Sequence, residues 1–183
     1  MRNSRAKEVA LTGMLFALAI ALSWLESCLA PILGLIPALK LGLSNIVVMY
    51  ALLFLRTRTA FMLVLLKALF AFLTRGVTAG ILSACGGVLS FLVLWSLLHL
   101  PFTVSDYIFC VCGALAHNVG QLAAASFILS SAMALAYAPV LLVAGIVVGG
   151  ISCLLTRALF TSLPKEITQH RRENSPFQNK NFS

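Results

Sequence analysis

The sequence predicts an all-α integral membrane protein, a bundle of six transmembrane helices. Its 183 residues are 61% hydrophobic and only 10% charged, whereas soluble domains carry about 25% charged residues. No Lys, Arg, Asp or Glu occurs between Tyr107 and Thr156. Since a helix needs about 20 apolar residues to span a hydrocarbon core of about 30 Å, the chain has room for about six spans.

The apolar runs place these spans at about residues 9–25, 43–55, 60–73, 80–98, 107–129 and 139–155. The first run resembles a signal peptide, but its length and Glu26 argue against cleavage, so we interpret it as a retained span. We therefore expect three regions: a cytoplasmic N-terminus (1–8), a six-helix transmembrane domain (9–160) and a basic, disordered cytoplasmic tail (161–183).

The net charge of +8 comes from basic residues that flank the spans, which is typical of membrane topology and not of nucleic-acid binding. With six spans, both termini lie on one side of the membrane. Lys40 and Arg75 would face the opposite side, whereas the other flanking basic residues share the side of the termini. The positive-inside rule then places both termini in the cytoplasm.

The sequence also argues against an enzyme. No GxxxxGK[ST] phosphate loop occurs, and Asp106 is the only aspartate, so the carboxylate clusters that hold magnesium are not expected. The five cysteines show no metal-binding or redox spacing, and we interpret them as small buried hydrophobes. We expect no catalytic residues, no metal and no cofactor.

The predicted fifth span carries three polar side chains in the stretch "GALAHNVGQ". Gly113, His117 and Gln121 are four residues apart and share one helix face, and Asn118 lies beside Gln121. Because an unpaired polar group is costly in lipid, this face must point inward. It forms either a polar binding pocket or an interhelical hydrogen-bond network, and we favour the pocket.

Lys67 lies near the middle of the short third span. Its side chain can either snorkel to the membrane surface or point into the bundle. The acidic residues all lie at or beyond the ends of the predicted spans, so an inward-pointing Lys67 suggests an anionic ligand.

The second span opens with "KLGLSN", which contains Lys40, Ser44 and Asn45. Ser44 can simply cap the helix, but a helix N-terminus next to a lysine is also suited to binding anions. Together with Arg75 these residues would line an outward-facing mouth, with Lys67 and the His117 group deeper in the bundle.

Small residues four apart occur in several spans, where they let helices approach closely in lipid. Most of these ridges are expected to pack inside the bundle. The ridge of Gly13, Ala17 and Ala21 lies on a terminal helix that can face outward, so a partner membrane subunit is an equally reasonable interpretation.

The chain resembles a bacterial family known both as the Gx transporter family and as heptaprenyl diphosphate synthase component I. The resemblance rests on "IPALKLGLSNIVVMYAL" (36–52), "GGVLSFLV" (86–93), "GALAHNVGQLAAA" (113–125) and "APVLLVAGIVVGG" (138–150). One departure is Lys67, where the family pattern has Arg; the charge is kept but bidentate geometry is lost.

The family is in turn similar to the substrate-binding S components of energy-coupling factor transporters, which are six-helix bundles driven by a coupling protein and separate ATPases. The resemblance implies a docking ridge at Ala17 and Ala21, which Gly13 can extend. It also implies a binding region at Lys40, Asn45, His117, Asn118 and Gln121. We therefore expect a multi-pass subunit of a small-molecule transporter in the bacterial plasma membrane.

Two alternatives stay open. The synthase name implies a non-catalytic membrane component in polyprenyl diphosphate synthesis, and relatives of the family are also linked with membrane redox systems of flavins or quinones. In each case the ligand is expected to be anionic or hydrogen-bonding.

Overall fold

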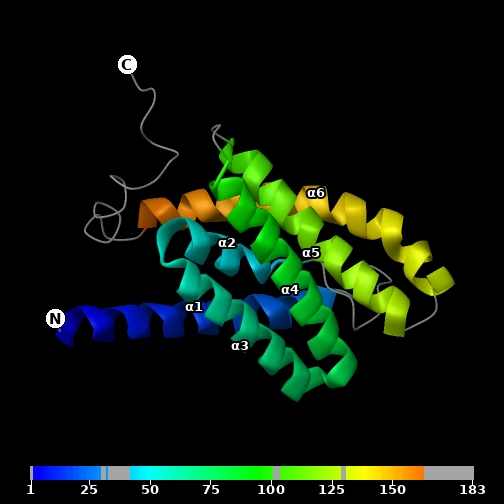
Figure 1. Ribbon diagram of the computed structural model, residues 1–183, viewed down its shortest axis with the longest axis horizontal. Helices are drawn as coiled ribbons and strands as arrows, with labels where there is room; N and C mark the ends of the chain where they lie inside the picture. Colours follow the sequence, from blue (N-terminus) through cyan, green and yellow to red (C-terminus); the bar gives the residue numbers. More distant parts are fainter. Residues whose placement is uncertain (1, 30–31, 33–41, 101–103, 129–130, 163–183) are drawn as a thin grey trace.

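The computed structural model describes residues 2–29, 32, 42–100, 104–128 and 131–162, and all regular elements among them are α-helices (Figure 1). They are α1 (Arg2–Leu29), α2 (Asn45–Phe54), α3 (Thr57–Arg75), α4 (Val77–Leu98), α5 (Asp106–Ile128) and α6 (Ser131–Ser162). The predicted all-α class is confirmed. The tail predicted to be disordered begins within α6, and its remaining residues, 163–183, lie outside the described residues.

Four of the described helices are long and apolar enough to cross a membrane: Val9–Leu29, Thr57–Arg75, Val77–Leu98 and Tyr107–Ile128. In α6 the corresponding apolar stretch is shorter, Ala138–Leu154. The structure therefore supports a multi-pass membrane protein, while the count of six spans stays a prediction.

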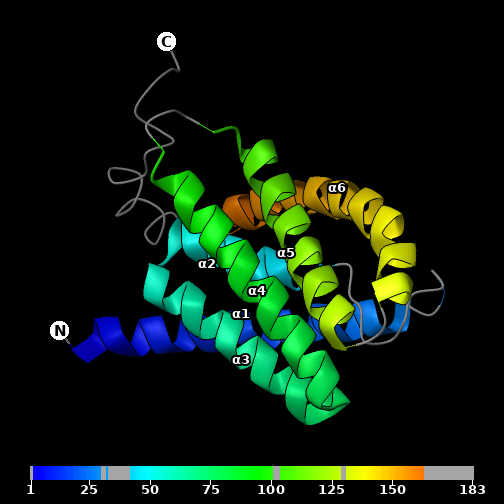
Figure 2. The same ribbon diagram turned by 45° about the vertical axis from the view of Figure 1, so that its right-hand side comes forward.

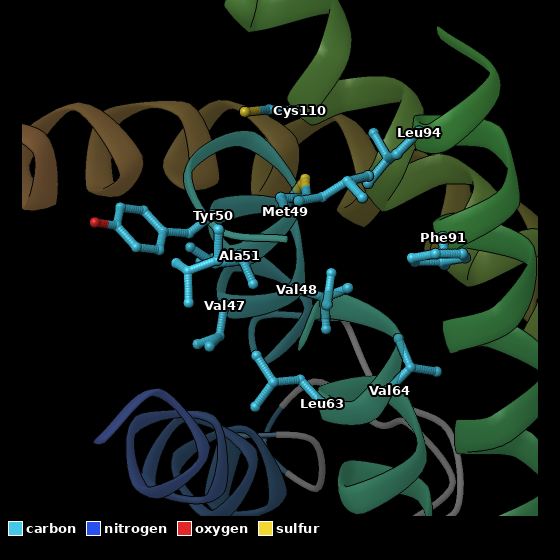
Figure 3. Packing of buried hydrophobic residues seen from close by; sticks show 14 of the residues in the cluster. Val47, Val48, Met49, Tyr50, Ala51, Leu63, Val64, Phe91, Leu94 and Cys110 are labelled. Atoms are coloured by element: carbon cyan, nitrogen blue, oxygen red, sulfur yellow. The ribbon is translucent and has the colours of Figure 1, made fainter. Parts of the chain in front are cut away.

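The helix found at the predicted second span, α2, is too short to cross a membrane. Its 10 residues rise about 15 Å at 1.5 Å per residue, about half of a hydrocarbon core. It contacts α1, α3, α4, α5 and α6, and all its described side chains from Asn45 to Leu52 are buried. Figure 3 shows α2 side chains packed toward α3 and α4. A helix that is apolar on all sides is buried either in protein or in lipid, and these contacts and burial show that α2 is buried in protein.

Two other boundaries differ from the prediction. The first helix continues through Glu26 to Leu29, although the predicted span ended at residue 25. The last helix begins at Ser131 and contains Pro139 in its interior, although a turn was expected before the proline. Prolines are tolerated inside membrane helices because neighbouring groups satisfy the freed backbone carbonyl.

Glycines set the close approach of α4, α5 and α6. A Cβ on Gly120 would lie 2.8 Å from the Cys85 carbonyl oxygen and 2.9 Å from the Gly86 Cα atom. A Cβ on Gly149 would lie 2.7 Å from the Val111 Cα atom. These ridges therefore pack inside the bundle, as predicted.

The outer surface of the bundle is apolar. Large side chains such as Met62, Leu73, Phe127 and Leu154 are exposed, as expected where lipid covers the protein. Cys28 and Cys85 are also exposed, so the expectation of buried cysteines holds only for some of the five.

The start of α1 and the end of α6 lie toward the same side of the bundle in both views (Figures 1 and 2). That this side faces the cytoplasm stays a prediction.

We predict that Gly120→Ala lowers the free energy of unfolding by about 1–3 kcal/mol, because the added methyl meets backbone atoms of α4 that cannot move aside. The matched control is Gly13→Ala, where a Cβ meets nothing within 4 Å and the higher helix propensity of Ala should leave stability unchanged or raised. Thermal unfolding in detergent compares the two. Equal effects would show that the α4–α5 crossing is not tightly packed.

Candidate functional site

The polar residues predicted on the fifth span do point into the bundle. His117, Asn118 and Gln121 on α5 are each at most 2% exposed, and Asn45 and Ser90 are fully buried. We call these five residues the polar core: Asn45, Ser90, His117, Asn118 and Gln121.

His117 and Gln121 form one half of the polar core. The Gln121 Nε2 and His117 Nε2 atoms are 2.7 Å apart and hydrogen-bonded across one helical turn. Gly86 of α4 packs directly on them, since a Cβ there would lie 2.8 Å from Gln121 Cγ and 2.9 Å from His117 Nδ1. Gly42 approaches from another side, where a Cβ would lie 3.0 Å from His117 Cδ2. Gly42 also has a φ of +95°. Glycine therefore suits this position both because a side chain would crowd His117 and because the backbone is left-handed.

A chain of hydrogen bonds fixes the orientation of Asn45. The Asn45 Nδ2 group donates to Ser90 Oγ at 2.6 Å, and the Ser90 hydroxyl donates to the Gly113 carbonyl at 2.8 Å. Because a carbonyl can only accept, Ser90 must donate to it and accept from Asn45. The Asn45 Oδ1 atom is thereby directed away, and it has no hydrogen-bond partner among the described residues.

Asn118 is held in the same way. Its Nδ2 group donates to the Leu141 carbonyl of α6 at 2.7 Å, so its Oδ1 atom faces the other direction, close to Gly42. This oxygen also has no hydrogen-bond partner in the described part of the chain. A purely structural network would leave few such buried acceptors.

Lys67 points into the protein and does not snorkel. It lies on the buried face of α3 with Ala60, Leu63, Val64 and Ala71, and it is 5% exposed. Its Nζ atom is buried and makes no hydrogen bond to any described residue. Arg75, at the end of α3, is half-buried, and its Nη1 atom likewise lacks a hydrogen-bond partner within the described ranges.

The expectation that no acid lies inside the bundle is wrong. Glu26 on α1 is fully buried, and its Oε1 atom accepts a hydrogen bond from the Gly42 backbone N–H. Its carboxylate interacts electrostatically with both Lys67 and Arg75. We call Glu26, Lys67 and Arg75 the charged cluster. Glu26 follows Leu15, Ala19 and Ser23 on the buried face of α1, and that spacing was the signal for its position.

The start of α2 lies beside these groups. Ser44 is buried, but its side chain makes no capping hydrogen bond, so the capping interpretation of Ser44 is wrong. The backbone N–H of Asn45 instead donates to the Gly42 carbonyl at 2.8 Å. A helix N-terminus carries a partial positive charge, and this one lies close to Glu26, which accepts the Gly42 N–H. Lys40 lies outside the described residues.

The predicted docking ridge faces outward. Gly13, Ala17 and Ala21 are exposed on α1, on the side opposite the buried stripe that ends in Glu26. The predicted site residues thus separate into two groups, a buried polar and charged region and an exposed strip of small residues.

The buried region combines cationic donors with amide oxygens, so it is suited to binding an anionic or hydrogen-bonding group. Within the described residues no three His, Cys, Asp or Glu side chains gather to hold a metal ion.

Comparison with known proteins gives one match. A family model described as heptaprenyl diphosphate synthase component I matches residues 15–159, which include the polar core and the charged cluster. No curated protein and no solved structure matches the chain significantly. Because the matched range covers most of the sequence, the predicted resemblance is confirmed: the chain belongs to the heptaprenyl diphosphate synthase component I family.

Proposed function

We propose that the protein is a non-catalytic membrane component of a heptaprenyl diphosphate synthase, and that its buried charged cluster binds the anionic head of an isoprenoid diphosphate. The observation that carries this proposal is Lys67, a buried cation whose Nζ atom makes no hydrogen bond to any described residue. The family match favours this role over the transporter role that the sequence analysis ranked first.

The energetics of Lys67 support an anionic ligand. Burying an ammonium group costs several kcal/mol, and the group must recover this through ion pairs and hydrogen bonds. Glu26 supplies charge attraction but directs its Oε1 atom to Gly42. The three donor protons of the ammonium are therefore available to a ligand oxygen.

The surrounding residues would orient such a ligand. Arg75 and Lys40 would add positive charge on the predicted outer side, and the start of α2 at Ser44 and Asn45 would add its helix dipole. In this proposal His117, Asn118 and Gln121 shape the deeper wall. The condensation chemistry belongs to a separate catalytic subunit, because that reaction uses magnesium held by clustered carboxylates and this chain has only five acidic residues.

A second candidate is the S-component-like transporter subunit, energised by separate coupling and ATPase subunits. The observation that favours it is the exposed strip of Gly13, Ala17 and Ala21 on α1. Small residues on a lipid-facing helix allow another membrane helix to pack closely. In this candidate the same buried region binds a small anionic solute.

The synthase proposal predicts that Lys67→Gln weakens binding of farnesyl diphosphate to the chain in lipid nanodiscs by on the order of tenfold to a hundredfold, the loss expected for a hydrogen bond to a charged group. Isothermal titration calorimetry measures this. Arg58→Gln, an exposed cation on α3, is the matched control and should bind like the wild type. Equal losses in both variants would show only non-specific attraction.

The same proposal predicts that heptaprenyl diphosphate production by the soluble catalytic partner depends on this chain and falls in the Lys67→Gln variant. Product is quantified in membranes that contain or lack the chain. Full production without the chain would contradict a role in the synthase and leave the transporter candidate.

The transporter candidate predicts that Ala17→Leu/Ala21→Leu abolishes co-purification with a membrane coupling subunit while leaving the melting temperature unchanged, since both side chains are exposed. Ala123→Leu, at an exposed position of α5, is the control and should co-purify normally. If the double variant co-purifies as well as the control, this face of α1 is not a docking surface.

A further inference from the structure

Glu26 is the one buried acid of the charged cluster, and the proposed function leaves its effect on the ligand unassigned. It is 0% exposed, near the C-terminal end of α1. Its Oε1 atom accepts a hydrogen bond from Gly42, three residues before the first residue of α2. Glu26 therefore links the end of one helix to the segment that starts the next.

The charges of the cluster do not balance. Glu26 acts on both Lys67 and Arg75, and these two cations also act on each other. The described cluster thus holds one negative and two positive groups. Of the two cations only Lys67 is buried, and because a charge in a low-dielectric interior is costly, a bound anion would stabilise its ammonium group.

Glu26 also stands in the region that attracts an anion. The α2 N-terminus and the side chain of Lys67 both favour negative charge nearby, and Glu26 is the negative group present there. A ligand anion that approaches Lys67 must therefore meet the repulsion of the Glu26 carboxylate.

We infer that Glu26 is the specificity-determining residue of this site: a resident counterion that competes with the ligand for Lys67 and Arg75 and limits how much negative charge the site accepts. This inference rests on the proposed anion-binding role of Lys67. Within the isoprenoid phosphates of the proposed function, Glu26 reduces the gain in affinity that each added negative charge on the head would bring. Removing the Glu26 charge should enlarge that gain.

The test uses the full chain in lipid nanodiscs, with farnesyl monophosphate and farnesyl diphosphate as probes of one tail and different charge. Glu26→Gln keeps an Oε1 acceptor for Gly42 but removes the charge. We expect it to bind the diphosphate on the order of tenfold more tightly, with a smaller gain for the monophosphate, because repulsion scales with ligand charge.

Two further variants test whether affinity follows the net charge of the cluster. Glu26→Gln/Arg75→Gln removes one charge of each sign, so its diphosphate affinity should lie near that of the wild type. Lys67→Gln should bind most weakly. Affinity is thus expected to follow the net charge of the cluster across the series.

The outcomes separate the two proposals. If Lys67→Gln weakens binding but Glu26→Gln leaves it unchanged or weaker, the anion site stands and Glu26 is only a structural link. If Glu26→Gln does not fold, Arg75→Gln decides: it lowers the net charge of the cluster and should weaken the diphosphate more than the monophosphate, and an affinity unchanged from the wild type for both probes overturns the inference. If the wild type and all variants bind neither probe, the anion site of the proposed function fails as well.

Discussion

The bilayer offers no hydrogen-bond partners, and this constraint organises the whole structure. Polar groups at membrane depth must be satisfied inside the protein, so the polar side chains of α5 point toward the other helices. The same constraint explains why a helix as short as α2 is possible. Its ends would be intolerable in lipid, but α2 is covered on all sides by α1, α3, α4, α5 and α6.

In the proposed function the binding site lies where α2 begins inside the bundle. A helix that ends inside the bundle exposes backbone donors and a dipole where the dielectric constant is low, and both act strongly there. Gly42 brings the backbone against His117, and Glu26 holds that backbone by accepting its N–H. The polar core and the charged cluster meet around this one residue, so the ligand site of the proposed function depends on the position of Gly42.

Much of this arrangement could be predicted from spacing. The four-residue interval between His117 and Gln121 correctly placed them on one inward face, and the helical class followed from composition. The length of α2 could not be predicted, because apolarity alone does not distinguish a helix in lipid from one buried in protein. Glu26 was missed because the predicted span ended at residue 25, although Glu26 continues the buried spacing of Ala19 and Ser23.

The sequence also could not tell whether the Lys67 side chain points inward or toward lipid. Both faces of α3 are apolar, so hydrophobicity does not distinguish them.

The most direct test of anion binding by Lys67 is a crystal structure of the chain in a lipid phase containing bromide, with the ion located by anomalous scattering. If Lys67 binds an anion, a bromide ion will lie within hydrogen-bonding distance of Lys67 Nζ. The claim is contradicted if bromide is found only at the exposed Arg56 and Arg58 and Lys67 is paired directly with a protein group.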